Sequence, residues 1–262
     1  MNKPYGSNKL NPLFVYNPEK HSELTKIAES LPNIVVSSAT AANAVMLGGG
    51  YFNPLTGYMN VADAISVADN MTTTSGLFWP TPVMNIAESV TSIGSAKRIS
   101  LRDPNVPGNP VIAVQDVESI ETISDEQLQH IAKKIYGTND NNHPGVEAFT
   151  TQGNIVVAGP IQVLNFSYFE IDFPETFRTA VQIRDEIEEY GWEKIVAFQT
   201  RNPMHRAHEE LCRMAQQATG ADGILVHMLL GKLKPGDIPA SVRDASIRQM
   251  VEVYFPPNTV MI

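Results

Sequence analysis

Short apolar runs alternate with turn residues up to about residue 165. The β-branched runs that are bounded by turn residues predict strands at residues 33–37, 110–115 and 154–158. Between these runs, the residue pattern predicts helices over residues 39–46 and 125–136, and Ser124 with Gln127 predicts a capping box at the start of the second helix. This part of the chain is therefore predicted to be β-rich with short helices.

The hydrophobic pattern changes near residue 171. Pro174 matches a first helical residue, and apolar residues at helical spacing predict a helix over residues 175–190 that Gly191 ends. Beyond it the pattern predicts strands at 195–198, 224–228 and 259–262 and helices at 203–218 and 242–254. A strand, a crossover helix and a second strand of these lengths form a parallel sheet, which binds ligands beyond the carboxyl ends of its strands.

These patterns predict two domains. Residues 1–168 form the β-rich domain, and residues 169–262 form an α/β domain with a parallel sheet. Because the chain stops inside the last predicted strand, which would leave an unpaired edge, we expect the second domain to be incomplete.

Charge narrows the range of partners. The formal net charge of −9 and the pI near 5.1 argue against nonspecific binding to nucleic acid or to an anionic membrane. From Lys194 to Arg248, however, eight Lys or Arg stand against five Asp or Glu. A locally basic stretch in an acidic protein suits a small anionic ligand.

Cysteine content and the chain's beginning indicate the compartment. The single cysteine, Cys212, cannot form an internal disulfide, and no pattern of paired Cys and His indicates a zinc site. The N-terminus lacks the order of a signal peptide, and no apolar run approaches the roughly 20 residues of a membrane helix. We therefore expect a cytoplasmic protein with no membrane partner.

The turn after the first strand of the second domain carries the most specific chemistry. Asn202 matches an N-cap and Pro203 a first helical residue, which would place free helix amides at the mouth of the sheet. Arg201 supplies a charged two-donor fork that matches a tetrahedral anion, and Gln199 adds a neutral donor. We therefore predict a phosphate or sulfate site at this turn.

His205 and His208 follow three positions apart and are predicted to share a helix face that points toward the same anion. Taken alone, such a pair is more often a surface feature, and Arg201 is more often a solvated charge. Metal binding by the pair is a weak alternative, because no carboxylate or Cys completes a ligand set, and no metal site is expected. The conjunction of strand, Gln-x-Arg, Asn-Pro and paired His within ten residues favours a functional site.

Two further patterns concern packing. The glycines Gly48 to Gly50 favour a turn or close packing over a phosphate cradle, because no helix bearing Lys-Ser or Lys-Thr follows them. The helix at 203–218 is predicted to pack through an apolar stripe made of Ala207, Leu211, Met214, Ala215 and Ala218.

The residues Gln199-Thr-Arg-Asn-Pro-Met-His-Arg-Ala-His208 resemble the signature of the sulfate adenylyltransferase (ATP sulfurylase) family. Their His-x-x-His part resembles, more weakly, the wider α/β-phosphodiesterase nucleotidyltransferases, many of which have Gly where Ala207 stands. Residues 229–238 with Arg243 resemble the next family segment, and residues 48–59 resemble the family's N-terminal PUA-like domain. The resemblance covers essentially the whole chain and implies a PUA-like domain followed by a Rossmann-like nucleotidyltransferase domain.

Carried over residue by residue, the resemblance implies that Gln199 and Arg201 bind sulfate. It also implies that Asn202, His205 and His208 contact ATP, and that the two histidines stabilise the transition state. The catalytic residues that it implies are Thr200, Arg201, Asn202, His205 and His208.

The implied reaction is in-line attack of a sulfate oxygen on the α-phosphorus of ATP, which gives adenosine 5′-phosphosulfate and pyrophosphate, or the reverse. Mg²⁺ is the implied cofactor and accompanies ATP. These four compounds are the expected partners, nucleic acid is not, and a homo-oligomer is expected. The later family motif Gly-Arg-Asp-His-Ala-Gly does not occur in the 262 residues, so we expect a chain truncated at its C-terminus relative to the family.

Two other functions stay open. Another adenylyl- or cytidylyltransferase of the same superfamily would share His205 and His208 but have no reason for Gln199 and Arg201 beside them. A non-catalytic protein, either an impaired truncated subunit or an RNA-binding PUA-like module, is the alternative from a different class. The acidic first domain has no basic, aromatic-rich stripe, which argues against RNA binding.

Overall fold

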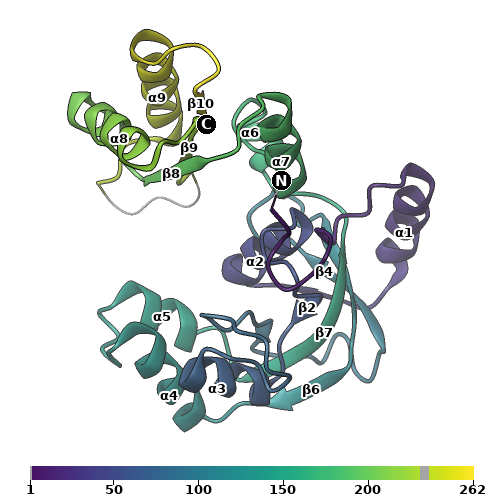
Figure 1. The fold of residues 1–262 in the computed structure, drawn as a ribbon. Coiled ribbons are helices and arrows are strands. Elements are labelled where there is room, and N and C mark those ends of the chain that lie inside the picture. The colour runs from purple at the N-terminus through teal and green to yellow at the C-terminus, as the bar shows by residue number, and fades with distance from the viewer. Residues whose placement is uncertain (1, 231–235) are drawn as a thin grey trace. The chain divides into compact units, whose positions relative to one another are not determined.

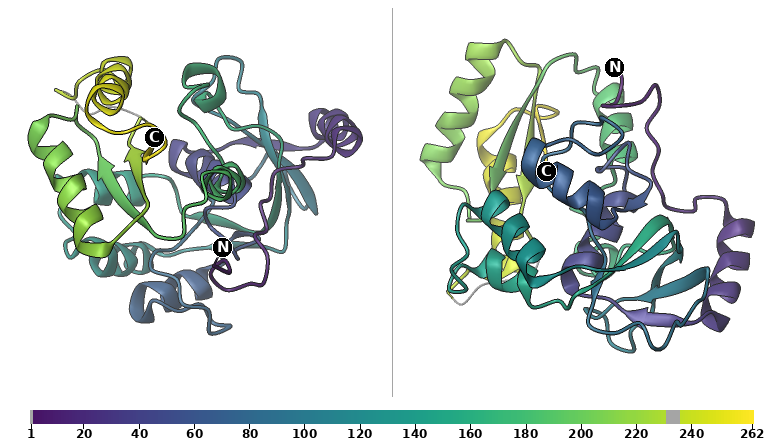
Figure 2. Two further views of the ribbon diagram at one scale, coloured as in Figure 1. Left: turned by 45° about the horizontal axis from the view of Figure 1, so that its top comes forward. Right: turned by 90° about the horizontal axis from the view of Figure 1, so that it is seen from below.

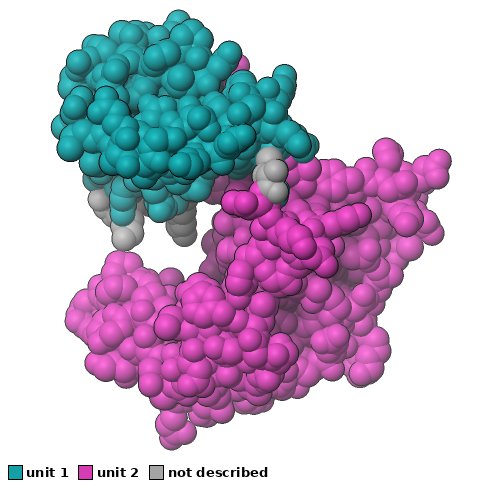
Figure 3. Space-filling view, viewed as in Figure 1, with its two compact units in different colours: residues 1, 182–262 teal, residues 2–181 magenta. Residues whose placement is uncertain are grey.

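The chain forms two compact units. The computed structural model describes residues 2–230 and 236–262. Residues 2–181 make up the first unit, and residues 182–262 make up the second (magenta and teal in Figure 3). The predicted domain boundary at residue 168 falls inside the first unit and stays a prediction.

The first unit is built on a mainly antiparallel sheet (Figure 1). The main path of the sheet runs β1 (Asn33–Val35), β4 (Arg98–Arg102), β5 (Val111–Asp116), β7 (Ile155–Val163) and β2 (Gly57–Tyr58). The strands β3 (Ile86–Ala87) and β6 (Ser119–Thr122) also pair with β7, and only the β1–β4 pair among these ladders is parallel. The predicted strands in this part of the chain are confirmed, whereas β2, β3, β4 and β6 were not predicted as strands.

Helices of the first unit cover the sheet. They are α1 (Pro18–Ser30), α2 (Ser38–Gly48), α3 (Val61–Asn70), α4 (Asp125–Tyr136), α5 (Pro144–Thr150) and α6 (Phe169–Asp172). At α4 the Ser124 side chain accepts from the Gln127 amide while the Gln127 side chain accepts from the Ser124 amide, so the predicted capping box is confirmed. Side-chain N-caps also begin α1, α2 and α3.

β5 is buried between two apolar clusters. Ala113 packs in the cluster that contains α2, and Val114 packs in the cluster that contains α1. Gly48 ends α2 where a Cβ would lie 2.8 Å from Cγ1 of Val163 on β7, so a side chain there would collide with the sheet. Gly50 follows with φ of 82°, a backbone conformation that favours glycine. These glycines therefore serve close packing and a turn, as predicted.

The helix predicted to start at Pro174 begins instead at Ala180, as α7 (Ala180–Glu189). The preceding residues are held to the first unit, because the Phe177 ring packs against Phe166 at 5.2 Å between centroids. The Ala180 amide also donates to the Gly49 carbonyl. Burying the aromatic ring takes precedence over the local helical pattern, so this prediction is wrong by about one and a half turns.

The second unit is the predicted βαβ arrangement, extended by one further step. Its elements are β8 (Ile195–Thr200), α8 (Arg206–Thr219), β9 (Gly223–Met228), α9 (Ala240–Tyr254) and β10 (Val260–Met261). The strands lie in the order β10-β9-β8, and both pairs are parallel. Figure 2 shows α8 and α9 beside these strands, and Cys212 of α8 and Ile247 of α9 share one apolar cluster with Ile224 of β9.

The predicted apolar stripe of α8 is wrong. Leu211 and Met214 are 51% and 57% exposed, whereas Cys212 and Glu209 face the interior. The buried Glu209 carboxylate forms ion pairs with Arg206 and Arg213, with an N–O distance of 2.9 Å in each pair. Because these pairs neutralise a buried acid, Glu209 can face the interior, and the helix does not take the orientation that its apolar pattern predicts. None of the described helices has both the length and the apolar character needed to cross a bilayer.

Candidate active site

A tight turn follows β8. The Thr200 hydroxyl donates to the Asn202 carbonyl at 2.9 Å and accepts from the Asn202 amide at 3.1 Å. The Leu229 amide, just past β9, donates to the Thr200 carbonyl at 3.0 Å. The turn is therefore fixed at the carboxyl end of the parallel sheet, where α/β proteins bind their ligands.

The helix after this turn begins later than its sequence predicts. Its N-cap is His205 and not Asn202, and Pro203 lies before α8 rather than at its first position. Asn202 is already held in the turn by Thr200, while the His205 ring accepts from the Ala207 amide at 3.3 Å. The predicted cap is wrong because the Thr200 hydroxyl and the His205 ring supply the local hydrogen bonds at these two places.

His205 and His208 lie against each other at the start of α8, with ring centroids 3.9 Å apart. His208 Nδ1 accepts from the His205 amide at 3.2 Å, and His205 Nδ1 accepts from the Ala207 amide. A nitrogen that accepts from an N–H carries no proton, so each neutral ring holds its proton on Nε2. Burial and the neighbouring His205 lower the pKa of His208, which favours this neutral donor form.

Arg201 is paired within the chain. Its Nη2 lies 2.7 Å and 2.8 Å from the two carboxylate oxygens of Asp237. The Arg201 side chain is 41% exposed, whereas that of Asp237 is 19% exposed. The guanidinium is therefore accessible, and a carboxylate already occupies part of the fork that was predicted to hold an anion.

Gln199 lies on the other side of the sheet from the histidine pair. It is exposed and stands opposite His227 in the register of β8 and β9, where burial lowers the pKa of His227. Phe198, which precedes Gln199 on β8, faces the helices, and its ring centroid lies 5.7 Å from that of His208. The structure thus joins Thr200 with Asn202 and His205 with His208, and places the Gln199 side chain on the opposite face.

Two residues at the turn had no role in the sequence predictions. Asp237 is paired with Arg201, and Arg243 of α9 donates through Nη1 to the carbonyls of Arg201, at 3.1 Å, and Leu229. Arg243 was quoted only as part of the segment resembling the family, and residues 231–235 of that segment lie outside the described residues. An Arg in the first turn of a helix that has no acid there was the sequence signal that could have found it, because a cation is unfavourable at a helix N-terminus.

The donors at this turn suit an anion. An Arg guanidinium and imidazole Nε2–H groups donate hydrogen bonds and match phosphate or sulfate oxygens. Among residues 2–230 and 236–262, no group of three or more His, Cys, Asp or Glu is arranged to hold a metal ion.

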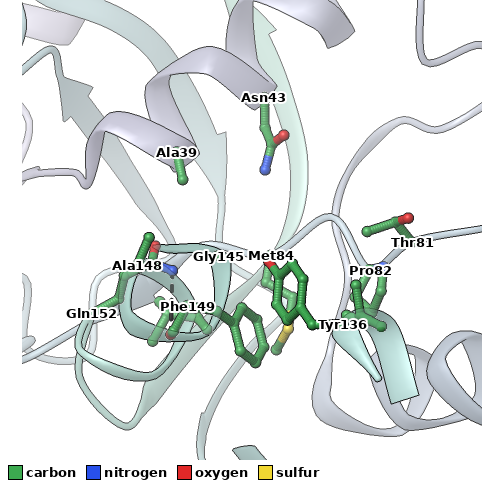
Figure 4. A pocket seen from close by; sticks show the side chains of 12 residues that line it. Ala39, Asn43, Thr81, Pro82, Met84, Tyr136, Gly145, Ala148, Phe149 and Gln152 are labelled. Carbon is green, nitrogen blue, oxygen red and sulfur yellow. Dashed lines mark hydrogen bonds between the residues drawn. The ribbon is translucent and has the colours of Figure 1, made fainter. Parts of the chain in front are cut away.

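A separate cavity of about 180 Å³ lies in the first unit, between α2, the end of α4, α5 and the segment at 81–86 (Figure 4). Tyr136 and Phe149 form aromatic parts of its wall, and Asn43 and Gln152 supply amides. None of the predicted site residues lines it.

Comparison with known proteins follows the same division of the chain. A PUA-like domain family matches residues 2–166, and an ATP-sulfurylase family matches residues 174–262. Sulfate adenylyltransferase of Allochromatium vinosum is 63% identical over 262 residues, which are 100% of this chain and 66% of that protein. The same enzyme of Alcanivorax borkumensis is 64% identical over 260 residues, 99% of this chain and 65% of that protein. The chain thus spans just under two thirds of the length of these curated relatives.

One solved structure gives a fold comparison. A hexameric APS kinase from Thiobacillus denitrificans superposes with a TM-score of 0.72 at 23% identity, over 99% of this chain and 46% of that chain. At this identity the likeness concerns the fold alone.

Proposed function

The chain belongs to the sulfate adenylyltransferase (ATP sulfurylase) family, and from that premise we propose that the whole protein joins sulfate to the α-phosphate of ATP. The products are adenosine 5′-phosphosulfate and pyrophosphate, and the same site can run the reaction in reverse. The protein is then an enzyme, a nucleotidyltransferase.

The turn from Gln199 to His208 is the observation that carries the proposal. It brings a guanidinium and two imidazole Nε2–H donors to the carboxyl end of a parallel sheet. We assign sulfate to Arg201 and the phosphates of ATP to Asn202, His205 and His208. For Gln199 to act as a second sulfate donor, its side chain would have to leave the face of the sheet opposite the histidine pair. Thr200 acts by holding Asn202 in the turn.

The mechanism is direct transfer in line with the departing pyrophosphate. A sulfate oxygen attacks the α-phosphorus, the bond to the bridging oxygen of pyrophosphate breaks, and no covalent enzyme intermediate forms. Sulfate is a poor nucleophile, so catalysis comes from holding two anions in contact and from stabilising the charge on the phosphoryl oxygens. The Nε2–H groups of His205 and His208 donate to those oxygens, because Nδ1 of each ring accepts from a backbone amide.

Mg²⁺ fits this site only as a companion of the nucleotide. The guanidinium and imidazole N–H groups at the turn do not ligate a cation, and Arg201 pairs with the Asp237 carboxylate, so the phosphates of ATP and water would hold the ion. Bound in this way, it would neutralise phosphate charge. The residues of the chain would then bind the oxygens that the ion leaves free.

The test uses the full-length protein with ATP, Mg²⁺ and sulfate. We expect pyrophosphate release that depends on sulfate, and adenosine 5′-phosphosulfate as the other product. If release depends instead on another acceptor, such as a phosphorylated alcohol, the protein is a different nucleotidyltransferase and the proposal is wrong. A cytoplasmic location and a homo-oligomer also belong to the proposal, and cell fractionation and sedimentation measure them.

A further inference from the structure

Arg243 is a buried charge at the end of the sheet. Its side chain extends from the first turn of α9 and is 2% exposed. Nη1 donates to the Arg201 carbonyl at 3.1 Å and to the Leu229 carbonyl. One nitrogen therefore links the backbone of the residue after β8 to that of the residue after β9.

The remaining nitrogens of this guanidinium are unsatisfied. Nε and Nη2 of Arg243 are buried and have no hydrogen-bond partner among the described residues. The nearby carboxylates are engaged elsewhere, because Asp237 pairs with Arg201 and Asp244 pairs with Arg248. A buried charge without a counter-ion is costly to stability, so its presence calls for an anion that the described residues do not supply.

We propose that Arg243 is a positioning residue of the anion site, which fixes the Arg201 turn through its carbonyl contacts and supplies a positive charge that is balanced only when a dianion binds. The inference rests on the proposed function, because sulfate is the dianion assigned to Arg201. Arg suits this task better than Lys, because one nitrogen of the planar guanidinium bonds both carbonyls while its other N–H groups keep fixed directions.

Thermal unfolding tests the charge. The full-length protein is heated with and without 10-fold more inorganic sulfate than its Kd, alone and with the α,β-methylene analogue of ATP and Mg²⁺. We expect the wild-type Tm to rise by about 2 °C in at least one condition. Chloride at matched ionic strength is the salt control, because sulfate also stabilises proteins nonspecifically.

Variants separate positioning from general packing. Arg243→Gln removes the charge, Arg243→Lys keeps the charge but loses the fork, and Arg248→Gln removes an Arg that lies one turn later in the ion pair with Asp244. We expect the sulfate-dependent rise in Tm to be lost in R243Q, reduced in R243K and unchanged in R248Q. A residue with a merely structural role would lower the Tm without sulfate and leave the rise intact.

Kinetics gives the second measurement. Loss of a charged hydrogen-bonding group predicts a sulfate KM about 10-fold higher in R243K and about 100-fold higher in R243Q, with the KM for ATP changed much less. If R243Q does not fold, R243K decides. The inference is wrong if R243K has the same sulfate KM as the wild-type protein and shows the same rise in Tm with sulfate.

The two proposals fail differently. A wild-type protein that releases pyrophosphate in response to sulfate, with variants that match it, overturns the role of Arg243 and leaves the proposed function standing. A wild-type protein whose Tm rises with sulfate but which releases no pyrophosphate overturns the function and keeps the anion site. No response to sulfate in either measurement overturns both.

Discussion

At the scale of single residues, the turn after β8 is a set of hydrogen-bond donors whose directions are fixed by the backbone. Nδ1 of His205 and of His208 accepts from a backbone amide, so each Nε2–H is left to face a ligand. Arg201 is held by the Asp237 carboxylate on its side chain and by Arg243 on its carbonyl. Each of these contacts predicts the effect of one substitution.

Arg201→Lys should raise the sulfate KM by about 10-fold to 100-fold although the charge is kept. A point charge on a flexible chain cannot reproduce two parallel donors to a tetrahedral anion. Initial rates at varied sulfate and fixed ATP measure this effect. Unchanged sulfate dependence in the full-length variant would remove Arg201 from the sulfate site.

Asp237→Asn should strengthen sulfate binding several-fold. The Asp237 carboxylate contacts Nη2 of Arg201 at 2.7 Å, so sulfate must compete with it for the same donors. The neutral amide competes less well. Asp244→Asn is the matched control, because that acid pairs with Arg248. A weaker sulfate affinity in D237N would show that Asp237 orients Arg201 instead of competing for it.

At the scale of elements, the start of α8 joins structure and chemistry. His205 is the N-cap and His208 closes the capping box, so the two rings that face the ligand also begin the helix. To separate the catalytic effect of a substitution at His205 or His208 from its effect on helix stability, the replacement must keep the capping hydrogen bond.

His205→Asn should keep the helix start and lose turnover, whereas His205→Ala should lose both. Asn is among the best N-caps, and losing the cap altogether costs about 1 kcal/mol. Urea unfolding gives the free energy of unfolding, and kcat gives the catalytic effect. Equal stability of the two variants would show that the His205 ring does not cap α8, and normal kcat in both would refute its role in the transition state.

Acid should weaken the second unit through His208. Its pKa in the folded protein is lowered, so its contribution to stability is present above the unfolded value near 6.5 and is lost as pH falls through the lower folded value. Burial also lowers the pKa of His227. His208→Gln keeps a capping-box side chain that does not titrate. Tm measured from pH 7.5 to 5 should fall less steeply in this variant, and an equal slope would contradict the assignment.

At the scale of the whole molecule, the two units differ in how their sheets are made. Residues 2–181 enclose a mainly antiparallel sheet between apolar clusters, and residues 182–262 form parallel strands with α8 and α9 packed against them. The segment between residues 169 and 181 belongs to the first unit through Phe169 and Phe177, whose rings pack at 5.7 Å between centroids.

A fragment of residues 2–181 should be more stable than one of residues 2–168. The shorter fragment loses both rings from the core cluster, which lowers the free energy of unfolding by about 2 kcal/mol or more. Both fragments contain Trp79 as their sole tryptophan, so its fluorescence in urea reports unfolding. Equal midpoints would place the domain end at the predicted residue 168.

Much of the architecture was determined by the sequence, because it depends on neighbours along the chain. Alternating apolar runs, turn residues and caps located β1, β5, β7, α2, α4 and the whole βαβ arrangement of the second unit. The short strands β2 and β3 escaped prediction because two residues carry no period. The candidate site was found as a turn for the same reason, since Gln199 to His208 is one continuous segment.

The tertiary structure alone decided how that segment is held and which side of α8 is buried. Arg201, Asp237 and Arg243 meet across 42 positions of sequence, and no local pattern relates them. Glu209 is buried because Arg206 and Arg213 neutralise it. A prediction from apolar periodicity assumes that every acid is exposed, so it assigns the wrong face of α8 to the interior. Local hydrogen bonds and periodicity depend on residues that are neighbours in the sequence. The burial of a charge depends instead on partners that only the folded chain brings together.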